Sequence, residues 1–149
     1  MSPYKAVVVI HVLSATIWTG GHLVLSLGFL PRALREKRPE IIEQFESRFE
    51  PIGIPSLVIQ LVTGLWLGIF YDSQPLGWFS FRGSLASHLA LKVILVGLTL
   101  VLALHARLRI IPNLNAENMK ALAFHIVAVT VIGVLLVILG VSIRTGGLF

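Results

Sequence analysis

Apolar residues fill four long stretches of the chain, and polar residues gather between them. These stretches cover about residues 4–30, 52–71, 84–111 and 118–143. Each one is long enough for a helix that crosses a hydrocarbon core of about 30 Å, which takes about 20 residues. Proline, glycine, asparagine and charged residues separate them, as expected at helix ends and turns. The pattern predicts an all-α integral membrane protein, an up-and-down bundle of four transmembrane helices that forms one domain over residues 1–149.

A shorter amphipathic segment lies between the first two apolar stretches. Residues 40–50 read EIIEQFESRFE. Its apolar side chains, Ile41, Ile42, Phe45 and Phe49, recur at the spacing of one helical stripe. A short helix of this kind lies well on a membrane surface. We therefore predict a connector helix about 40–50 on the cytoplasmic face of the membrane.

The composition agrees with a membrane protein and excludes several classes of site. Of the 149 residues, 56% are hydrophobic and 13% are charged, whereas a soluble domain carries about 25% charged residues. The chain has no cysteine, which excludes disulfides, thiolate metal sites and iron–sulfur clusters. The net charge of +5 is not gathered into a basic and aromatic patch. We therefore expect a lipid bilayer and no nucleic acid as a partner.

Lysine and arginine are distributed unevenly between the two sides of the predicted bundle. Eight flank the loops after the first and third stretches: Arg32, Arg35, Lys37, Arg38, Arg48, Arg107, Arg109 and Lys120. Three flank the opposite side, namely Lys5, Arg82 and Arg144. Cytoplasmic loops carry the excess of positive charge. The sequence therefore predicts a multi-pass protein of a bacterial-type cytoplasmic membrane with both termini outside.

All five histidines fall inside the apolar stretches. Ionisable residues in membrane helices are costly and usually face the bundle interior, so five together indicate a function. By depth along their helices, His11 and His88 share the outer leaflet with Lys92, which lies one helical turn after His88. The other three histidines share the inner leaflet. We therefore predict two layers of imidazole.

Paired histidines on facing helices, without cysteine, favour haem b as the cofactor. For the outer layer we predict His11 and His88 as axial ligands, with Lys92 as the rival partner of His11. Arg144 is a candidate partner for a haem propionate there. The alternative interpretation of Lys92 is a lysine that snorkels toward the interface.

For the inner layer we predict His22 with His125 as axial ligands and keep His105 as the alternative. His22 repeats His11 eleven positions later, almost three helical turns away on the same face. Arg107, Arg109 and Arg32 are the candidate propionate partners on this side. A helix that serves two cofactors in this way implies two haems per chain.

Glycines near the histidines have two interpretations. Gly20 and Gly21 flank His22, the second stretch contains Gly64-x-x-x-Gly68, and the fourth has Gly133 and Gly140 near the face of His125. Such positions offer flat space for a porphyrin or, equally, allow close packing of helices. The GxxxG pattern also makes a homodimer conceivable.

The first stretch reads H-x6-W-x-G-G-x3-L and is followed by FLPRAL. In this it resembles the copper-resistance protein D (CopD) family and the related HemJ-type protoporphyrinogen oxidases. The third stretch, with His88 and Lys92, resembles the lysine-bearing helix of the HemJ type. The resemblance implies a four-helix membrane protein. In the HemJ type it implies haem b at the positions of His11 and Lys92, and in the CopD family it implies copper handling.

Three functions remain open on the sequence. The first is a membrane b-type cytochrome with two haems that transfers electrons in or across the bilayer, with a quinol as a possible partner. The second is a copper-homeostasis membrane protein that uses the same histidines as copper ligands. The third is a HemJ-like oxidase, so a membrane oxidoreductase activity stays open. The chain lacks the methionine and cysteine clusters that bind Cu(I), since it has two methionines and no cysteine.

Overall fold

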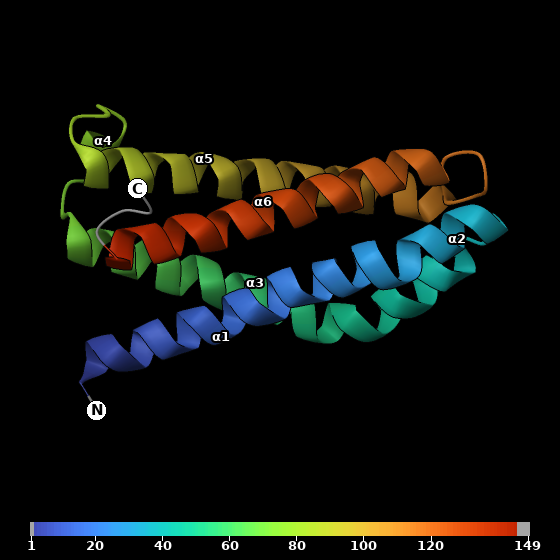
Figure 1. Ribbon diagram of the computed structural model, residues 1–149, viewed down its shortest axis with the longest axis horizontal. Coiled ribbons are helices and arrows are strands. Elements are labelled where there is room, and N and C mark those ends of the chain that lie inside the picture. Colours follow the sequence, from blue (N-terminus) through green and yellow to red (C-terminus); the bar gives the residue numbers. More distant parts are fainter. Residues whose placement is uncertain (1, 146–149) are drawn as a thin grey trace.

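The computed structural model describes residues 2–145, and over this range the chain is built from helices without strands. Four of its helical segments are long and apolar enough to cross a membrane: Pro3–Glu36, Glu40–Tyr71, Ser84–Asn113 and Met119–Thr145. The predicted all-α architecture with four spans is thereby confirmed (Figure 1).

The first span runs past the proline that we expected to end it. Helix α1 (Pro3–Val24) continues through a π-helical turn, η1 (Leu25–Phe29), into α2 (Leu30–Glu36). Proline in a continuous α-helix loses one hydrogen bond and clashes with the carbonyl four residues earlier. The π turn widens the backbone just before Pro31, which then occupies the first turn of α2, where proline is tolerated. The predicted helix end at Pro31 is therefore wrong.

The third span uses the same arrangement. Helix α5 (Ser84–His105) continues into a second π-helical turn, η2 (Ala106–Ile110), and a 3₁₀ turn, η3 (Ile111–Asn113), which contains Pro112. Here the predicted range of 84–111 agrees with the structure to within two residues.

The second span corrects the predicted surface connector. Helix α3 (Glu40–Tyr71) is one continuous helix that includes residues 40–50. Its stripe packs into the bundle, with Ile42 only 1% exposed. The reason is the short connection after α2, which folds the start of α3 back against α1 and α2. The stripe was recognised, but its partner is the protein interior and not the membrane surface.

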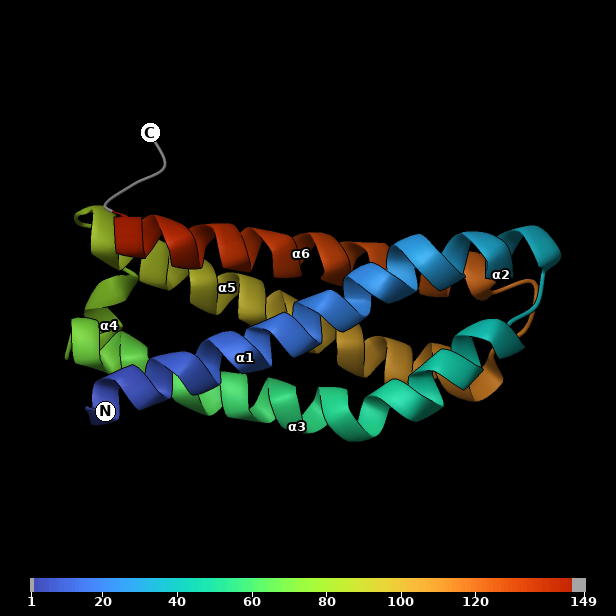
Figure 2. The ribbon, with the colours of Figure 1, turned by 60° about the horizontal axis from the view of Figure 1, so that its bottom comes forward.

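Helix α6 (Met119–Thr145) lies beside both α1 and α5. Helix α1 runs diagonally: it contacts α3 from Tyr4, which stacks on Phe70, to Gly21, which Phe49 covers, and it approaches α6 toward α2 (Figures 1 and 2). The first and fourth spans are therefore neighbours, as a pairing of His22 with His125 requires. The short helix α4 (Pro75–Trp78) lies at the same end as the start of α1 (Figure 1). We call this the α4 end and the opposite one the α2 end.

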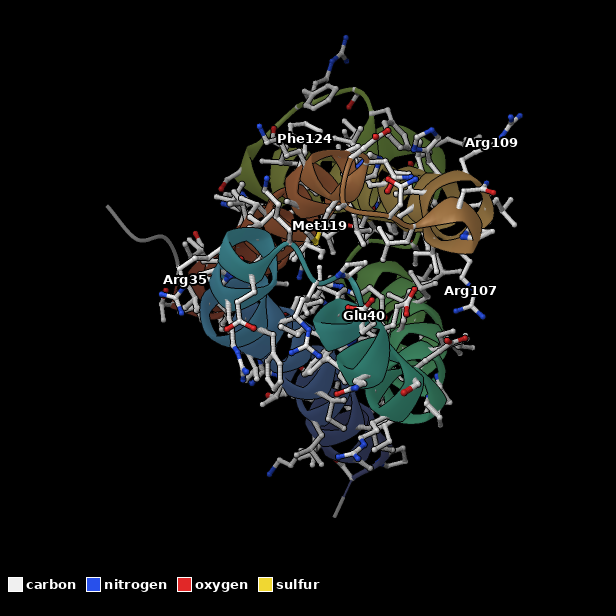
Figure 3. All side chains as sticks on the ribbon, turned by 90° about the vertical axis from the view of Figure 1, so that its right-hand side faces the viewer. Arg35, Glu40, Arg107, Arg109, Met119 and Phe124 are labelled. Atoms are coloured by element: carbon white, nitrogen blue, oxygen red, sulfur yellow. The ribbon has the colours of Figure 1, made fainter. Side chains whose placement is uncertain are left out.

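The larger apolar core lies at the α2 end. Its buried members are Leu25, Leu30, Ala33, Ile42, Ala106, Ile110, Met119, Leu122, Ala123 and Ile126. Figure 3 looks onto this end and shows Met119 among the helices, with Arg107 and Arg109 at the rim. A smaller cluster at the α4 end consists of Trp78, Leu89 and Ala90, with Ile143 packed against them.

Small polar residues occupy the contacts between helices. Buried members of this group are Ser14, Thr19, Ser56, Thr99, Thr130 and Ser142. Large apolar side chains cover the outside instead, for example Leu27 at 75% and Val101 at 65% exposure. This distribution is typical of helices that pack inside a bilayer, because lipid accepts the apolar side chains and small residues let helices approach.

Candidate functional site: two histidine layers

The structure arranges the predicted ligands as an α2-end layer and an α4-end layer. The α2-end layer contains His22, His105 and His125, and the α4-end layer contains His11, His88 and Lys92. Contacts within each layer define it, as described below.

Three of the histidines are fixed by their own helices. His22, His88 and His125 each place Nδ1 against the carbonyl oxygen four residues earlier, at 2.9, 2.6 and 2.8 Å. A carbonyl oxygen only accepts hydrogen bonds, so Nδ1 of each neutral ring carries the proton. The lone pair is then on Nε2, which points away from the parent backbone. Such an orienting bond is common for histidines that ligate metals.

Two histidines of the α2-end layer contact each other. His105 Nδ1 lies 2.9 Å from His125 Nε2, and the two rings stack at 5.0 Å between centroids. Because His125 Nδ1 already donates to its helix, His105 is the donor in this bond. Nε2 of His105 therefore keeps its lone pair. The residue that the sequence offered as an alternative to His125 is in fact its partner.

A cavity of about 120 Å³ lies among the four spans at the α2 end. His22 from α1 and His125 from α6 both line it, while the rest of its wall comes from Trp18, Glu46, Phe49, Glu50, Ile54, Leu102, Ala103, Ala106, Arg107, Ile111, Leu122, Ile126 and Val129. The two histidines that we predicted as a pair thus face a shared space.

Two glutamates on the cavity wall were not predicted. Glu46 and Glu50 lie one turn apart on α3, on either side of Phe49. The sequence carried a signal for them, since their spacing places both next to the apolar stripe. The predicted place of residues 40–50 on the membrane surface put both carboxylates outside the bundle.

The predicted propionate partners have other neighbours. Arg107 forms an ion pair with Glu50 across the gap between α5 and α3, with its side chain 52% exposed. Arg144 is exposed at the end of α6, close enough to Tyr71 of α3 for an electrostatic interaction.

In the α4-end layer, His11 is held by α3. Its Nδ1 lies 2.9 Å from the hydroxyl oxygen of Thr63, whose own proton goes to the carbonyl of Ile59 at 2.6 Å. His11 is therefore the donor, and its Nε2 keeps the lone pair. Gly64 makes this approach possible, since a Cβ there would lie 3.0 Å from His11 Cε1.

Lys92 has an unusual environment for a cation. Its ammonium packs beside Gly140 of α6, where a Cβ would lie 3.5 Å from Nζ. It is near enough to His11 for their charges to interact. Within residues 2–145 it has no hydrogen bond or ion pair, and the buried side-chain oxygen of Gln60 has no hydrogen-bond partner either. Both groups remain available for a ligand or water.

His88 is turned toward α6. Its Nε2 accepts a hydrogen bond from the Ser142 hydroxyl at 3.3 Å. Of the two partners that we considered for His11, the structure therefore brings Lys92 into its neighbourhood and gives His88 a different neighbour.

The glycines serve packing at most of the positions that we considered for a porphyrin. The ring of Phe49 covers Gly21, and Trp78 covers Gly68. Thr19 lies against Gly133, where a Cβ would be 3.1 Å from its hydroxyl oxygen. Gly64 and Gly68 thus contact His11 and Trp78 of the same chain, so the GxxxG pattern is accounted for without a homodimer.

The α2-end layer as packed here does not fit haem b. Pockets for ligands of drug size measure about 300–1,000 Å³, whereas this cavity has about 120 Å³. Separately, the described part of the chain, residues 2–145, contains no group of three or more His, Asp or Glu side chains already placed to hold a bare metal ion. The cavity has room for water or a small ion next to His22 and His125.

Comparisons with known proteins identify one family. The family model described as Copper resistance protein D matches residues 43–143, more than half of the chain. His88, Lys92, His105 and His125 lie inside the matched region, while His11 and His22 precede it. Comparisons with curated proteins and with solved structures gave no match. The chain is a four-span membrane protein that belongs to the copper resistance protein D family.

Proposed function

We propose that this protein handles copper inside the membrane by binding a copper ion at the α2-end cavity. The observation that carries the proposal is that His22 and His125, from two different spans, line one small cavity in a chain of this family. Glu46 and Glu50 line the same cavity. The arrangement offers nitrogen and carboxylate donors in a volume that suits an ion.

The donor chemistry fits copper in a nitrogen-rich environment. Imidazole is a good ligand for copper, and helix bonds at Nδ1 direct Nε2 of His22 and His125 outward from their backbones. Soft sulfur ligands for Cu(I) are scarce, and Met119 is buried in the apolar core. We therefore propose Cu(II), or copper bound mainly by nitrogen, as the species held here.

A copper ion at His125 has one local consequence. Nε2 of His125 accepts the proton of His105 in the metal-free protein. A copper ion held by that nitrogen would take the lone pair that accepts this hydrogen bond, and His105 would then lose its acceptor. Since no three donors are converged beforehand, binding requires this adjustment. Metal affinity is pH-dependent in such a site, because each ligating imidazole must be neutral.

Calorimetric titration of the purified protein with Cu(II) tests the proposal. We expect His22→Ala and His125→Ala each to weaken binding by at least about ten-fold, since second-shell losses alone cost about 10–100-fold at metal sites. His88→Ala is the matched control, because it removes an equally anchored imidazole at the α4 end. Equal affinity in all four proteins would contradict copper binding at this cavity.

Haem b at the α4-end layer is a second candidate, and one observation favours it. His11 offers a free Nε2, and Lys92, a residue without a hydrogen bond or ion pair inside residues 2–145, lies close to it. Both are strong axial donors of the kind that bind haem iron. The haem would supply one-electron redox chemistry, and the protein would supply its ligands and an apolar surrounding.

An optical spectrum of the reduced protein, purified after growth with haem precursor, tests this second candidate. Bands typical of b-type haem that disappear in both His11→Ala and Lys92→Ala support it. A colourless wild-type preparation contradicts it and leaves the copper proposal untouched, since the two sites share no residue.

We further propose that the α2 end faces the cytoplasm of a bacterial-type cell and that both termini lie on the opposite, non-cytoplasmic side of the membrane. The proposal rests on the excess of lysine and arginine at the α2 end. The connections after α2 and after η3 both lie at that end (Figure 1). Reporter fusions inside the segment 37–39 are expected to read cytoplasmic. A reading on the outer side would reverse the orientation.

A further inference from the structure

We propose that water and cations reach the α2-end cavity from the side, through an opening between α3 and α5 that the Glu50–Arg107 ion pair closes. An open groove of about 310 Å³ runs along α3, lined by Ser47, Glu50, Pro51, Ile54 and Pro55. Glu50 and Ile54 also line the inner cavity. Glu50 and Ile54 therefore border both spaces.

The helix packing leaves this side of the bundle weakest. Helix α1 packs against α3 and α6, and α5 packs against α6, whereas α3 and α5 are not closely packed along their described lengths. The ion pair between Glu50 and Arg107 spans the gap between them. Since the Arg107 side chain is about half exposed, it is able to swing outward without unpacking a helix.

The two prolines of α3 leave two backbone carbonyls without helical donors beside the groove, whose wall is otherwise mostly apolar. Proline has no N–H, so Pro51 and Pro55 leave the carbonyls four residues earlier, those of Ser47 and Pro51, without their helical donors. Both residues with a freed carbonyl line the groove. At membrane depth, such carbonyls are tolerated where they are re-satisfied by protein or meet a water-filled space. The groove supplies that space directly beside Glu50.

The charged side chains that line the α2-end cavity favour the entry of a cation over that of an anion. Glu46, Glu50 and Arg107 are the charged side chains on the cavity wall, which gives it a net charge of −1 when all three are ionised and the histidines are neutral. When Arg107 moves outward, two carboxylates face the opening without a counter-charge. The identity of the cation as copper rests on the proposed function, whereas the path itself does not.

The absence of native cysteine makes the path directly testable. The probe is a cationic, water-soluble methanethiosulfonate reagent, applied without copper to the protein in lipid nanodiscs. We expect Ala103→Cys, on the cavity wall, to be modified. Val101→Cys is the matched control on the same helix, because its side chain is 65% exposed on the apolar outer surface and its thiol should stay unmodified in lipid.

Opening of the ion pair gives the second readout. Adding Arg107→Gln to Ala103→Cys should raise the modification rate by up to about five-fold, the factor that an exposed ion pair is able to supply.

Ala106→Cys, which also lines the cavity, repeats the test if Ala103→Cys does not fold. Unmodified thiols at both cavity positions, with a reactive Glu117→Cys in the loop as positive control, would overturn the path. So would a rate that Arg107→Gln leaves unchanged. Neither result bears on copper affinity, which the calorimetric titration measures separately.

Discussion

The two ends of the bundle use the same residue type in different surroundings. At the α2 end, His22 and His125 border a cavity that also carries charged side chains from α3 and α5. At the α4 end, His11 and His88 each have a hydroxyl neighbour on another helix, Thr63 and Ser142. A histidine in a membrane helix thus does not define a site by itself. Its neighbours decide whether it faces a ligand space or a packed contact.

The two ends also differ in whether their charged side chains form ion pairs. Arg107 at the α2 end is paired with Glu50 and partly exposed. Lys92 at the α4 end lies inside a span with no ion pair in the described chain. A buried cation without a partner is costly in a bilayer. The charged side chains of the α2-end cavity thus include an ion pair, whereas Lys92 of the α4 end has none within residues 2–145.

The largest expected effect comes from filling the α2-end contact between α1 and α3. Gly21→Leu forces a side chain into the ring of Phe49, and overpacking of this kind costs about 1–3 kcal/mol or more. Gly20→Leu is the control, because nothing lies within 4 Å of a Cβ at Gly20. Thermal unfolding in detergent should show a large loss for the first variant only. Equal losses would mean that Phe49 does not hold α3 against α1 as described.

Removing the positive charge of Lys92 at the α4 end should raise the stability of the protein, whereas Gly21→Leu lowers it. Lys92→Met keeps the length of the side chain and removes the ammonium, so we expect the ligand-free protein to gain about 2 kcal/mol of stability. Thermal unfolding of ligand-free protein measures the change. A clear loss of stability would show that Lys92 has a stabilising partner, such as a bound cofactor or lipid.

The coupling energy between His105 and His125 at the α2 end should be smaller than the two changes in stability above. The hydrogen bond between His105 and His125 is expected to contribute about 1 kcal/mol. A double-mutant cycle with His105→Ala and His125→Ala isolates this term, because the two residues contact each other directly. Additive losses would contradict the bond, and a coupling that disappears when Cu(II) is added would agree with copper displacing it.

The smallest effect on stability is expected at the ion pair. Glu50→Gln breaks the bond to Arg107, but an exposed pair contributes about 0.2–1 kcal/mol and is screened by salt. Unfolding midpoints should shift little, and the shift should shrink as salt is raised. A loss of several kcal/mol would mean that the pair supports the fold rather than closing an opening.

The sequence predicted the four spans because long apolar runs follow directly from the solvent properties of the bilayer. It misplaced the end of the first span and the nature of residues 40–50. Pro31 reads as a breaker, and only the π turn before it explains why the helix continues. The amphipathic stripe of residues 40–50 is compatible with a surface or with a bundle, and only the fold-back of α3 decides between them.

The histidines of the candidate site were predictable from the sequence, but their contacts were not. Interior histidines stand out in an apolar chain, and depth along each helix groups them correctly. Rotation of the helices about their axes is what places His105 against His125 and turns His88 to Ser142. Spacing in one helix does not fix that rotation. For the same reason, Glu46 and Glu50 entered the site only with the structure.

Copper binding at the α2-end cavity is tested most directly by electron paramagnetic resonance of the protein loaded with Cu(II). The account predicts superhyperfine splitting from nitrogen, altered by ¹⁵N-histidine labelling, that is lost in His22→Ala and His125→Ala and kept in His88→Ala. A Cu(II) signal without nitrogen splitting, or one that persists unchanged in both α2-end variants, would contradict the account.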